Sequence, residues 1–172
     1  MSDRRRAPQP ARLAYAHRLR TCLASDVRAE EQAAFYVALL PGSRVEQVVR
    51  RPDGGVVAAE FALLGAPFLT LNMGMAVAHG TGASISVLTG DQAETDRLWD
   101  ALLDGGRAMR CGWLTDRFGV AWQVVPEALP RLLCAPDAAA AGRATRAMMT
   151  MGKIDIAALE AAFHAEHEEA EA

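Results

Sequence analysis

Two stretches of the chain resemble one another at a spacing of 63 residues, and this repeat constrains the fold more than any other feature. In both stretches apolar side chains recur at helical spacing and a glycine follows. The matching pairs are Phe35 and Leu98, Tyr36 and Trp99, Ala38 and Ala101, Leu39 and Leu102, Leu40 and Leu103, and Gly42 and Gly105. An apolar strand precedes each helix, within residues 19–25 and 83–88. The chain therefore contains two copies of one structural unit.

The strands after each helix complete the unit. After the first helix we expect a strand over residues 43–50, a turn at 52–55, and two strands within 56–72 that part at Leu64 and Gly65. After the second helix we expect shorter strands, from about residue 107 to 114 and from 120 to 125. A single βαβββ unit would leave one sheet face uncovered, so the two units should pack together and enclose a cleft.

The expected organisation has three parts. Residues 1–18 form a basic tail that is extended or disordered, because arginines crowd it and chain ends are usually poorly ordered. Residues 19–126 hold the paired modules, divided into 19–78 and 79–126. Residues 127–172 form a helical extension, in which Asp137 and Asp155 are suited to cap helices. The fold class is therefore α+β.

Residues 111–126 predict a β-hairpin. Asp116 and Gly119 suit a type I turn that a residue with positive φ closes. Beyond the turn the sequence alternates, which places Trp122 between two valines on one face and Gln123 on the other. Gln123 is the only polar side chain in this strand, so its face is predicted to line a cavity while helices cover the tryptophan face.

Composition narrows the function classes. The apolar fraction of 51% is enough to fill a core, and the net charge of -3 gives no general attraction to nucleic acid or to a membrane surface. The three cysteines lack any metal-ligand spacing, and no apolar run reaches about 18 residues. We therefore expect a cytoplasmic protein without nucleic-acid or membrane partners.

The hairpin, with the downstream run PDAAAAGRATRAMMTMGKIDIAALEAA, resembles the PhnB-like branch of the vicinal oxygen chelate superfamily, often labelled demethylubiquinone methyltransferase-like. The similarity continues upstream in AEEQAAFYVALLPGSRV, EFALLGAPFLTLN and SISVL. The superfamily also includes glyoxalase I, extradiol dioxygenases and the bleomycin and fosfomycin resistance proteins. The resemblance implies two βαβββ modules around an open, barrel-like cleft, commonly in a homodimer, with a divalent metal in the catalytic members.

The same resemblance indicates where metal ligands would lie. The corresponding positions here are Thr21, Thr70, Ser84 and Gln123. Three hydroxyls and one amide do not compensate a divalent ion for its lost water, so we expect no metal and no other cofactor. These residues should instead bind a small organic ligand.

Three further residues complete the expected ligand site, and one is left open. Asn72 shares the predicted face of Thr70, Trp113 could stack on a flat ligand, and His79 is the only histidine near the expected cleft. Alternation places Glu60 on the opposite face of its sheet, toward solvent or a helix. Whether Glu60 or His79 reaches the cleft is not decided by the sequence.

Three functions compete at this stage. The favoured one is metal-free binding of a small organic molecule in the cleft. The alternative is an isomerase, lyase or dioxygenase that uses Gln123 with Glu60 or His79. A third is an interaction module whose arginine-rich start docks on an acidic partner. Nothing in the sequence resembles a methyl-donor site, so the methyltransferase label is discounted.

Overall fold

The computed structural model describes residues 17–165, and the predicted basic tail lies almost entirely outside this range. The first module holds β1 (Thr21–Ser25), α1 (Ala29–Leu39), β2 (Arg44–Arg50), β3 (Val56–Leu63) and β4 (Ala66–Asn72). Its strands lie in the order β1-β4-β3-β2, with β1 parallel to β4 and the other pairs antiparallel.

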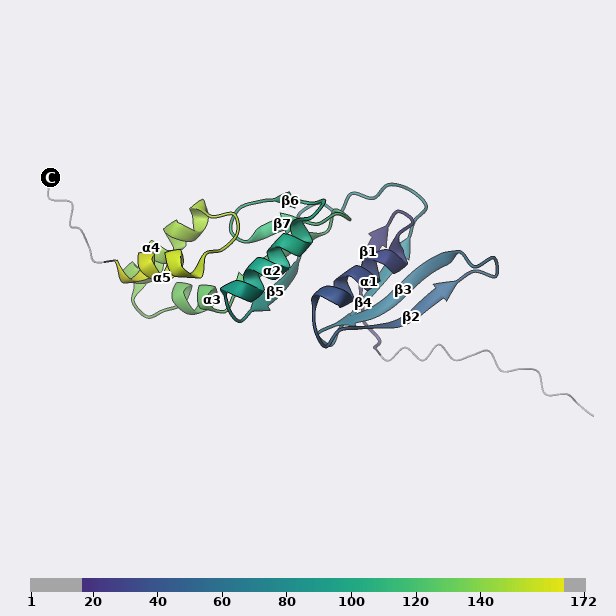
Figure 1. Ribbon diagram of the computed structural model, residues 1–172, viewed down its shortest axis with the longest axis horizontal. Coiled ribbons are helices and arrows are strands. Elements are labelled where there is room, and N and C mark those ends of the chain that lie inside the picture. The colour runs from purple at the N-terminus through teal and green to yellow at the C-terminus, as the bar shows by residue number, and fades with distance from the viewer. Residues whose placement is uncertain (1–16, 166–172) are drawn as a thin grey trace, which may run out of the picture.

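The second module repeats this arrangement. It holds β5 (Ile85–Thr89), α2 (Gln92–Leu103), β6 (Arg107–Ala108), β7 (Trp113–Thr115) and β8 (Ala121–Pro126). The order β5-β8-β7-β6, with β5 parallel to β8, matches the first sheet strand for strand. The predicted α+β fold with two βαβββ units is confirmed, and the two four-stranded sheets lie side by side without closing into a barrel (Figure 1).

One strand prediction is wrong. Residues 107–114 were expected to form one strand, but they form β6 and the start of β7 with a turn between them. The backbone of Cys111 and Gly112 has positive φ, 60° and 78°, which an extended strand excludes. The amides of both residues donate to Met151 and Gly152 in the connection after α4, so the turn anchors the C-terminal helices.

The two modules share one core. Tyr36 on α1 contacts the ring of Trp122 on β8, with centroids 5.1 Å apart in an edge-on arrangement. Phe118, in the turn before β8, packs against the same tyrosine at 5.9 Å. Tyr36 and Trp122 are both fully buried, so α1 fills the space between its own sheet and the β7–β8 hairpin. As predicted, Trp122 lies on a face that helices cover.

A buried carboxylate fixes this contact. Asp116 accepts hydrogen bonds from the Tyr36 hydroxyl at 2.6 Å and from Nε1 of Trp122 at 2.9 Å. It also accepts from the backbone amides of Phe118 and Val120, and its backbone oxygen accepts from Gly119, whose φ is 80°. Burial and the adjacent Asp116 charge raise the pKa of Tyr36 far above its usual value, so the phenol keeps the proton that it donates.

The C-terminal extension forms a separate helical cluster. It consists of α3 (Ala128–Leu133), α4 (Ala138–Thr150) and α5 (Ile156–His164), which lie beyond the second sheet (Figure 1). Asp137 and Asp155 cap α4 and α5 as predicted, accepting from backbone amides at 2.9 to 3.0 Å. Leu129, Leu132, Ala144, Ile154 and Leu159 form the apolar centre of this cluster.

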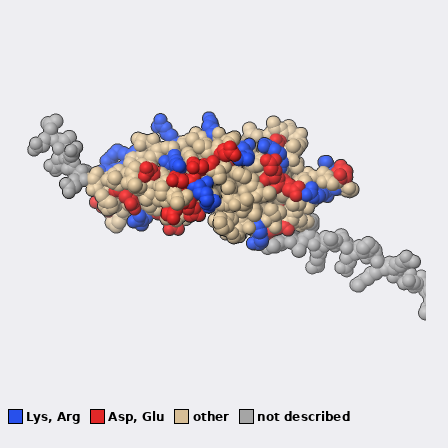
Figure 2. Space-filling model, viewed as in Figure 1, with Lys and Arg blue, Asp and Glu red and all other residues tan. Residues whose placement is uncertain are grey.

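Charges of both signs are mixed on the visible surface, with no side given over to one sign (Figure 2). Among the helices of residues 17–165, none combines the length and the apolar character that crossing a membrane requires.

Candidate functional site

Each sheet has one face covered by its own helix and one helix-free face. On β4, the fully buried hydroxyl of Thr70 donates to the carbonyl oxygens of Ala29 at 2.8 Å and Ala59 at 3.2 Å. Thr70 therefore lies under α1. Thr70 was expected on the cleft face, so the expected assignment of faces is inverted. Residue alternation determines which side chains share a face, but it does not determine which face the helix covers.

Asn72 lies on the same covered side. Its Oδ1 accepts from the backbone amide of Ala29 at 2.8 Å, and its Nδ2 donates to the carbonyl of Val56 at 3.0 Å. The amide thus satisfies one of the free N–H groups at the start of α1, for which Arg28 provides no side-chain cap. Both polar ends of Asn72 are engaged in holding the fold.

Glu60 pairs with Leu69 and shares its face, as predicted, but this is the helix-free face rather than the expected side of solvent or a helix. It is buried and forms an ion pair with Nη2 of Arg20 at 3.3 Å. The same nitrogen lies 2.8 Å from Glu46, and hydrogen bonding to Arg20 lowers the pKa of the Glu46 carboxyl. Arg20 thus neutralises two carboxylates on this face, a role that its place among the N-terminal arginines did not indicate.

In the second sheet, the helix-free face carries the polar residues that the hairpin predicted. Nε2 of Gln123 donates to the hydroxyl oxygen of Ser84 at 2.7 Å. Trp113 pairs directly with Gln123 across β7 and β8, so its side chain lies on the same face. Gln123, Ser84 and Trp113 therefore stand together, on the face opposite Trp122.

A cavity of about 170 Å³ lies at the junction of the two modules, and we call it the junction cavity. Its walls come from the edge strands β1 and β5, from the loop that contains His79, and from Val120 and Ala121 at the start of β8. The lining residues are Thr21, Cys22, Leu23, His79, Ala83, Ser84, Ile85, Val120 and Ala121. The structure thus brings together Thr21, His79 and Ser84 from the predicted site, and Gln123 adjoins them through Ser84.

His79 is the distinctive polar group of the junction cavity. Its Nε2 is shielded from solvent and has no hydrogen-bond partner among the described residues. Because Nε2 has almost no accessible surface, a water molecule in the cavity does not reach it in this conformation. Among the described residues, the lining includes no Asp, Glu, Lys or Arg, and its polar side chains are His79, Ser84, Thr21 and the thiol of Cys22.

Cys22 also lines the junction cavity, and no pattern in the sequence indicated this position. Its neighbours Thr21 and Leu23 also line the cavity, because β1 is an edge strand and presents its edge as well as its faces. Partial burial raises the pKa of the Cys22 thiol, which favours the protonated and weakly nucleophilic form. The thiol therefore contributes to the wall rather than to covalent chemistry.

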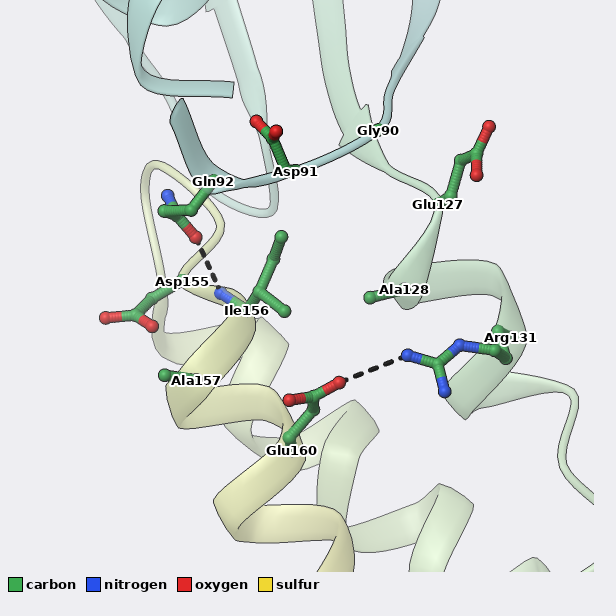
Figure 3. Close-up of a pocket in the computed structure, with 10 residues that line it drawn as sticks. All are labelled: Gly90, Asp91, Gln92, Glu127, Ala128, Arg131, Asp155, Ile156, Ala157 and Glu160. Atoms are coloured by element: carbon green, nitrogen blue, oxygen red, sulfur yellow. Dashed lines mark hydrogen bonds and ion pairs between the residues drawn. The ribbon is translucent and has the colours of Figure 1, made fainter. Parts of the chain in front are cut away.

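A larger cavity of about 560 Å³ lies between α2 and the C-terminal helices (Figure 3). Its main polar groups already have partners. Asp91 and Asp155 cap α2 and α5, Gln92 accepts from the Ile156 amide at 2.9 Å, and Arg131 pairs with Glu160 at 3.1 Å. This cavity is built on residues that hold the helices together, so the junction cavity is the better candidate site.

The residues on these faces do not suit a divalent metal ion. Thr70 is committed to two backbone carbonyls, and Ser84 and Gln123 bond to each other. Within residues 17–165, no three His, Cys, Asp or Glu side chains form a group that could hold an ion. Neutral hydroxyl and amide oxygens alone are a poor replacement for the water around such an ion.

Comparison with known proteins supports the fold. A family model described as 3-demethylubiquinone-9 3-methyltransferase matches residues 17–125, which excludes helices α3 to α5. The solved structure of the PhnB protein from Bacillus cereus is 24% identical, and the match covers 64% of this chain and 99% of that one with a TM-score of 0.59. A protein from Pseudomonas aeruginosa is 23% identical over 63% of this chain and 96% of its own, with a TM-score of 0.54. No match was found among the curated proteins compared.

Proposed function

Because the chain belongs to the 3-demethylubiquinone-9 3-methyltransferase family, we propose that it uses that family's fold to bind a small organic molecule without a divalent metal. The membership confirms the resemblance to PhnB-like proteins. The observation that carries the proposal is the junction cavity, where Thr21, His79 and Ser84 of the predicted site adjoin apolar side chains and Gln123 is bonded to Ser84. Ligand pockets are commonly apolar with a few polar groups that fix orientation.

Methyl transfer, which the family's description names, is not what the junction cavity favours. A nucleoside-sized methyl donor needs a pocket in the usual range of roughly 300 to 1,000 Å³. The junction cavity measures about 170 Å³, so it suits one small molecule rather than a donor and an acceptor together. The cavity of about 560 Å³ lies within that range, but Gln92 and Arg131 in its lining are already engaged with Ile156 and Glu160. We therefore infer binding rather than methyl transfer.

An enzyme of the superfamily is the second candidate, and one observation favours it. Glu60 was expected to point away from the cleft, but it lies on the helix-free face of the first sheet. Its carboxylate is paired with Arg20 and does not line the junction cavity, so a role in catalysis would require that pair to open. Binding without turnover is the simpler use of the present geometry.

We further propose that the protein acts as a homodimer in the cytoplasm. Leu88 on the helix-free face of β5 is 59% exposed, and Leu64 in the turn before β4 is 61% exposed. Both line a largely apolar groove of about 350 Å³ that also contains Ile85 and Ser86. A contiguous apolar surface beside the candidate site is suited to contact with a second copy, which would enclose the Gln123 face. The partners are then one small ligand and one further copy of this chain.

The deciding experiment is elemental analysis of protein purified without chelator, followed by titration with nickel, zinc, manganese and iron. We expect less than one metal per ten chains. In parallel, a library of small organic compounds is screened by the NMR signal of the Gln123 side-chain amide, with Gln92, which lines the larger cavity, as the matched control signal.

Compounds that move the Gln123 signal and leave Gln92 unchanged would support the proposal. Stoichiometric metal together with turnover would overturn it in favour of a metal-dependent enzyme. A library that moves neither signal would also count against it, because the cavity would then have no organic occupant.

A further inference from the structure

We infer that the molecule bound beside Gln123 is an aromatic carboxylate, and that Trp113 and Arg107 select it. The inference rests on the proposed function and adds the chemical class of the ligand. It follows from the strand register of the second sheet, which places an indole ring, an amide and a guanidinium group on one face.

One row of this face is formed by side chains from three neighbouring strands. Trp113 on β7 pairs with Gln123 on β8, and Gln123 pairs with Ser86 on β5. Side chains directly opposite one another in an antiparallel pair have Cβ atoms about 4.5 to 5.5 Å apart, so the indole stands next to the amide. Trp113 is only half-buried, which leaves part of its ring available for stacking with a flat ligand.

Arg107 lies in the next row of the same face. It pairs with Thr115 on β7, and Thr115 is two residues from Trp113, so both point to the same side. Diagonal neighbours of this kind lie about 7 to 8 Å apart, a distance that a long side chain spans. Arg107 is exposed and has no ion-pair or hydrogen-bond partner among residues 17–165, so its guanidinium is free to pair with a ligand.

The charge of the face favours an anion. Among the residues of β5 to β8 that share it, Arg107 is the only charged one, and the others are Ser86, Leu88, Trp113, Thr115, Ala121, Gln123 and Val125. A guanidinium donates two parallel hydrogen bonds to a carboxylate. A carboxylate at the edge of a ring that stacks on Trp113 is within reach of Arg107, whereas an ammonium group at the same place is repelled.

The surroundings of Gln123 orient the ring. Its Nε2 donates to Ser84, whereas no described residue donates to its Oε1, which can therefore accept from a ring hydroxyl or ring N–H. Ala121 and Ser84 also line the junction cavity, so this face continues into the cavity. At the other end of β8, Val125 packs against the C-terminal helical cluster, which bounds the face there.

The test measures the binding of 2-naphthoate, 2-naphthalenemethanol and 2-naphthylmethylamine to the full chain. Chemical-shift titration of the isotopically labelled protein is followed at the indole N–H of Trp113 and at the side-chain amide of Gln123. We expect the acid to bind about threefold more tightly than the alcohol, and the amine to bind most weakly, because an accessible ion pair contributes a few-fold in affinity. About 1 M sodium chloride should remove the preference for the acid without weakening the alcohol.

Arg107→Gln is the deciding variant. It should reduce the affinity for 2-naphthoate to that of the alcohol, while the alcohol binds as before. Arg146→Gln, at an exposed position of α4, is the matched control and should change neither affinity. Trp113→Leu should weaken the binding of the acid and of the alcohol by about tenfold, because stacking on the indole is lost. The backbone amide spectrum of each variant checks that its fold is preserved.

The outcomes separate this inference from the proposed function. If the amine binds as tightly as the acid, if Arg107→Gln leaves the preference for the acid unchanged, or if the acid binds without moving the Trp113 signal, the inference is overturned. If none of the three probes binds but a library compound moves the Gln123 signal, the ligand class is wrong and the proposed function stands. If no library compound binds either, both fail.

Discussion

At the scale of single residues, Asp116 has the most demanding position. It is 3% exposed, and its carboxylate accepts four hydrogen bonds, two from side chains and two from backbone amides. A carboxylate with several donors around it is stabilised in its charged form even when water is excluded. The same residue closes the hairpin turn and holds Tyr36, so a local turn signal in the sequence has a long-range role.

Replacing Asp116 by Asn should lower the free energy of unfolding by about 3 kcal/mol. One carboxylate oxygen becomes an NH₂ group, which cannot accept from the buried donors that now face it, and unsatisfied buried donors cost about 1 to 3 kcal/mol each. Denaturant titration measures the change. Asp53→Asn, at a 68% exposed side chain in a turn, is the control and should stay within about 0.5 kcal/mol. Equal effects of the two variants would contradict the role given to Asp116.

Tyr36→Phe tests the same bond from its other end. The ordinary pKa of tyrosine is 10.0 and that of Tyr36 is raised, so above pH 10 the unfolded chain loses the phenol proton while the folded chain keeps it. Stability that is complete below pH 10 is therefore lost as the pH rises further. The variant should be less stable at pH 7 by about 1 kcal/mol and should decline less steeply above pH 10.

At the scale of elements, the turn between β6 and β7 ties the C-terminal helices to the second sheet. Gly112 has a φ of 78°, and a Cβ there would lie 2.8 Å from the carbonyl oxygen of Val124 and 3.2 Å from the side chain of Ile154. The backbone of β8 and the Ile154 side chain, in the connection before α5, therefore approach this glycine more closely than any other residue would allow.

Gly112→Ala should destabilise the protein by several kcal/mol, since it adds a steric clash to the strain of a positive φ. Gly74→Ala is the matched control. Gly74 also has a positive φ, of 69°, but nothing lies within 4 Å of the added carbon, so only the backbone cost of about 1 to 2 kcal/mol remains. Thermal unfolding compares the two variants. A similar loss at both positions would show that the close contacts with Val124 and Ile154 are unimportant.

The elements also show what a sequence can and cannot predict here. The repeat predicted both helices and the βαβββ succession of elements along the chain, and capping residues such as Asp155 marked the helix starts. The choice of face failed at Thr70, because period-two alternation is unchanged when a sheet is turned over. It succeeded at Trp122, which lies on the buried side as its alternation with the neighbouring valines predicted. The junction cavity depends on how two edge strands approach, and that distance leaves no pattern in the residues.

At the scale of the whole molecule, the helix-free face of the second sheet should carry the dimer contact. Leu88→Lys places a charge at a side chain that is now 59% exposed, and in a homodimer the same residue is altered in both copies. We expect the variant to elute as a monomer with an unchanged melting temperature at high dilution. Size-exclusion chromatography with light scattering makes the measurement.

Met149→Lys is the control for that variant, because Met149 is 52% exposed and lies on α4, in the helical cluster beyond the second sheet. It should leave the molecular mass unchanged. If the unaltered protein is a monomer, there is no dimer contact. If Met149→Lys alone dissociates the dimer, the contact lies elsewhere.

The contact between Tyr36 and Asp116 also makes the two halves of the duplication unequal. In the second copy the residue that corresponds to Tyr36 is Trp99, which has no hydroxyl and is buried within the shared core. The bond that joins the halves therefore runs from the first helix to the second hairpin and has no counterpart donated by Trp99, although the two sheets share one strand order.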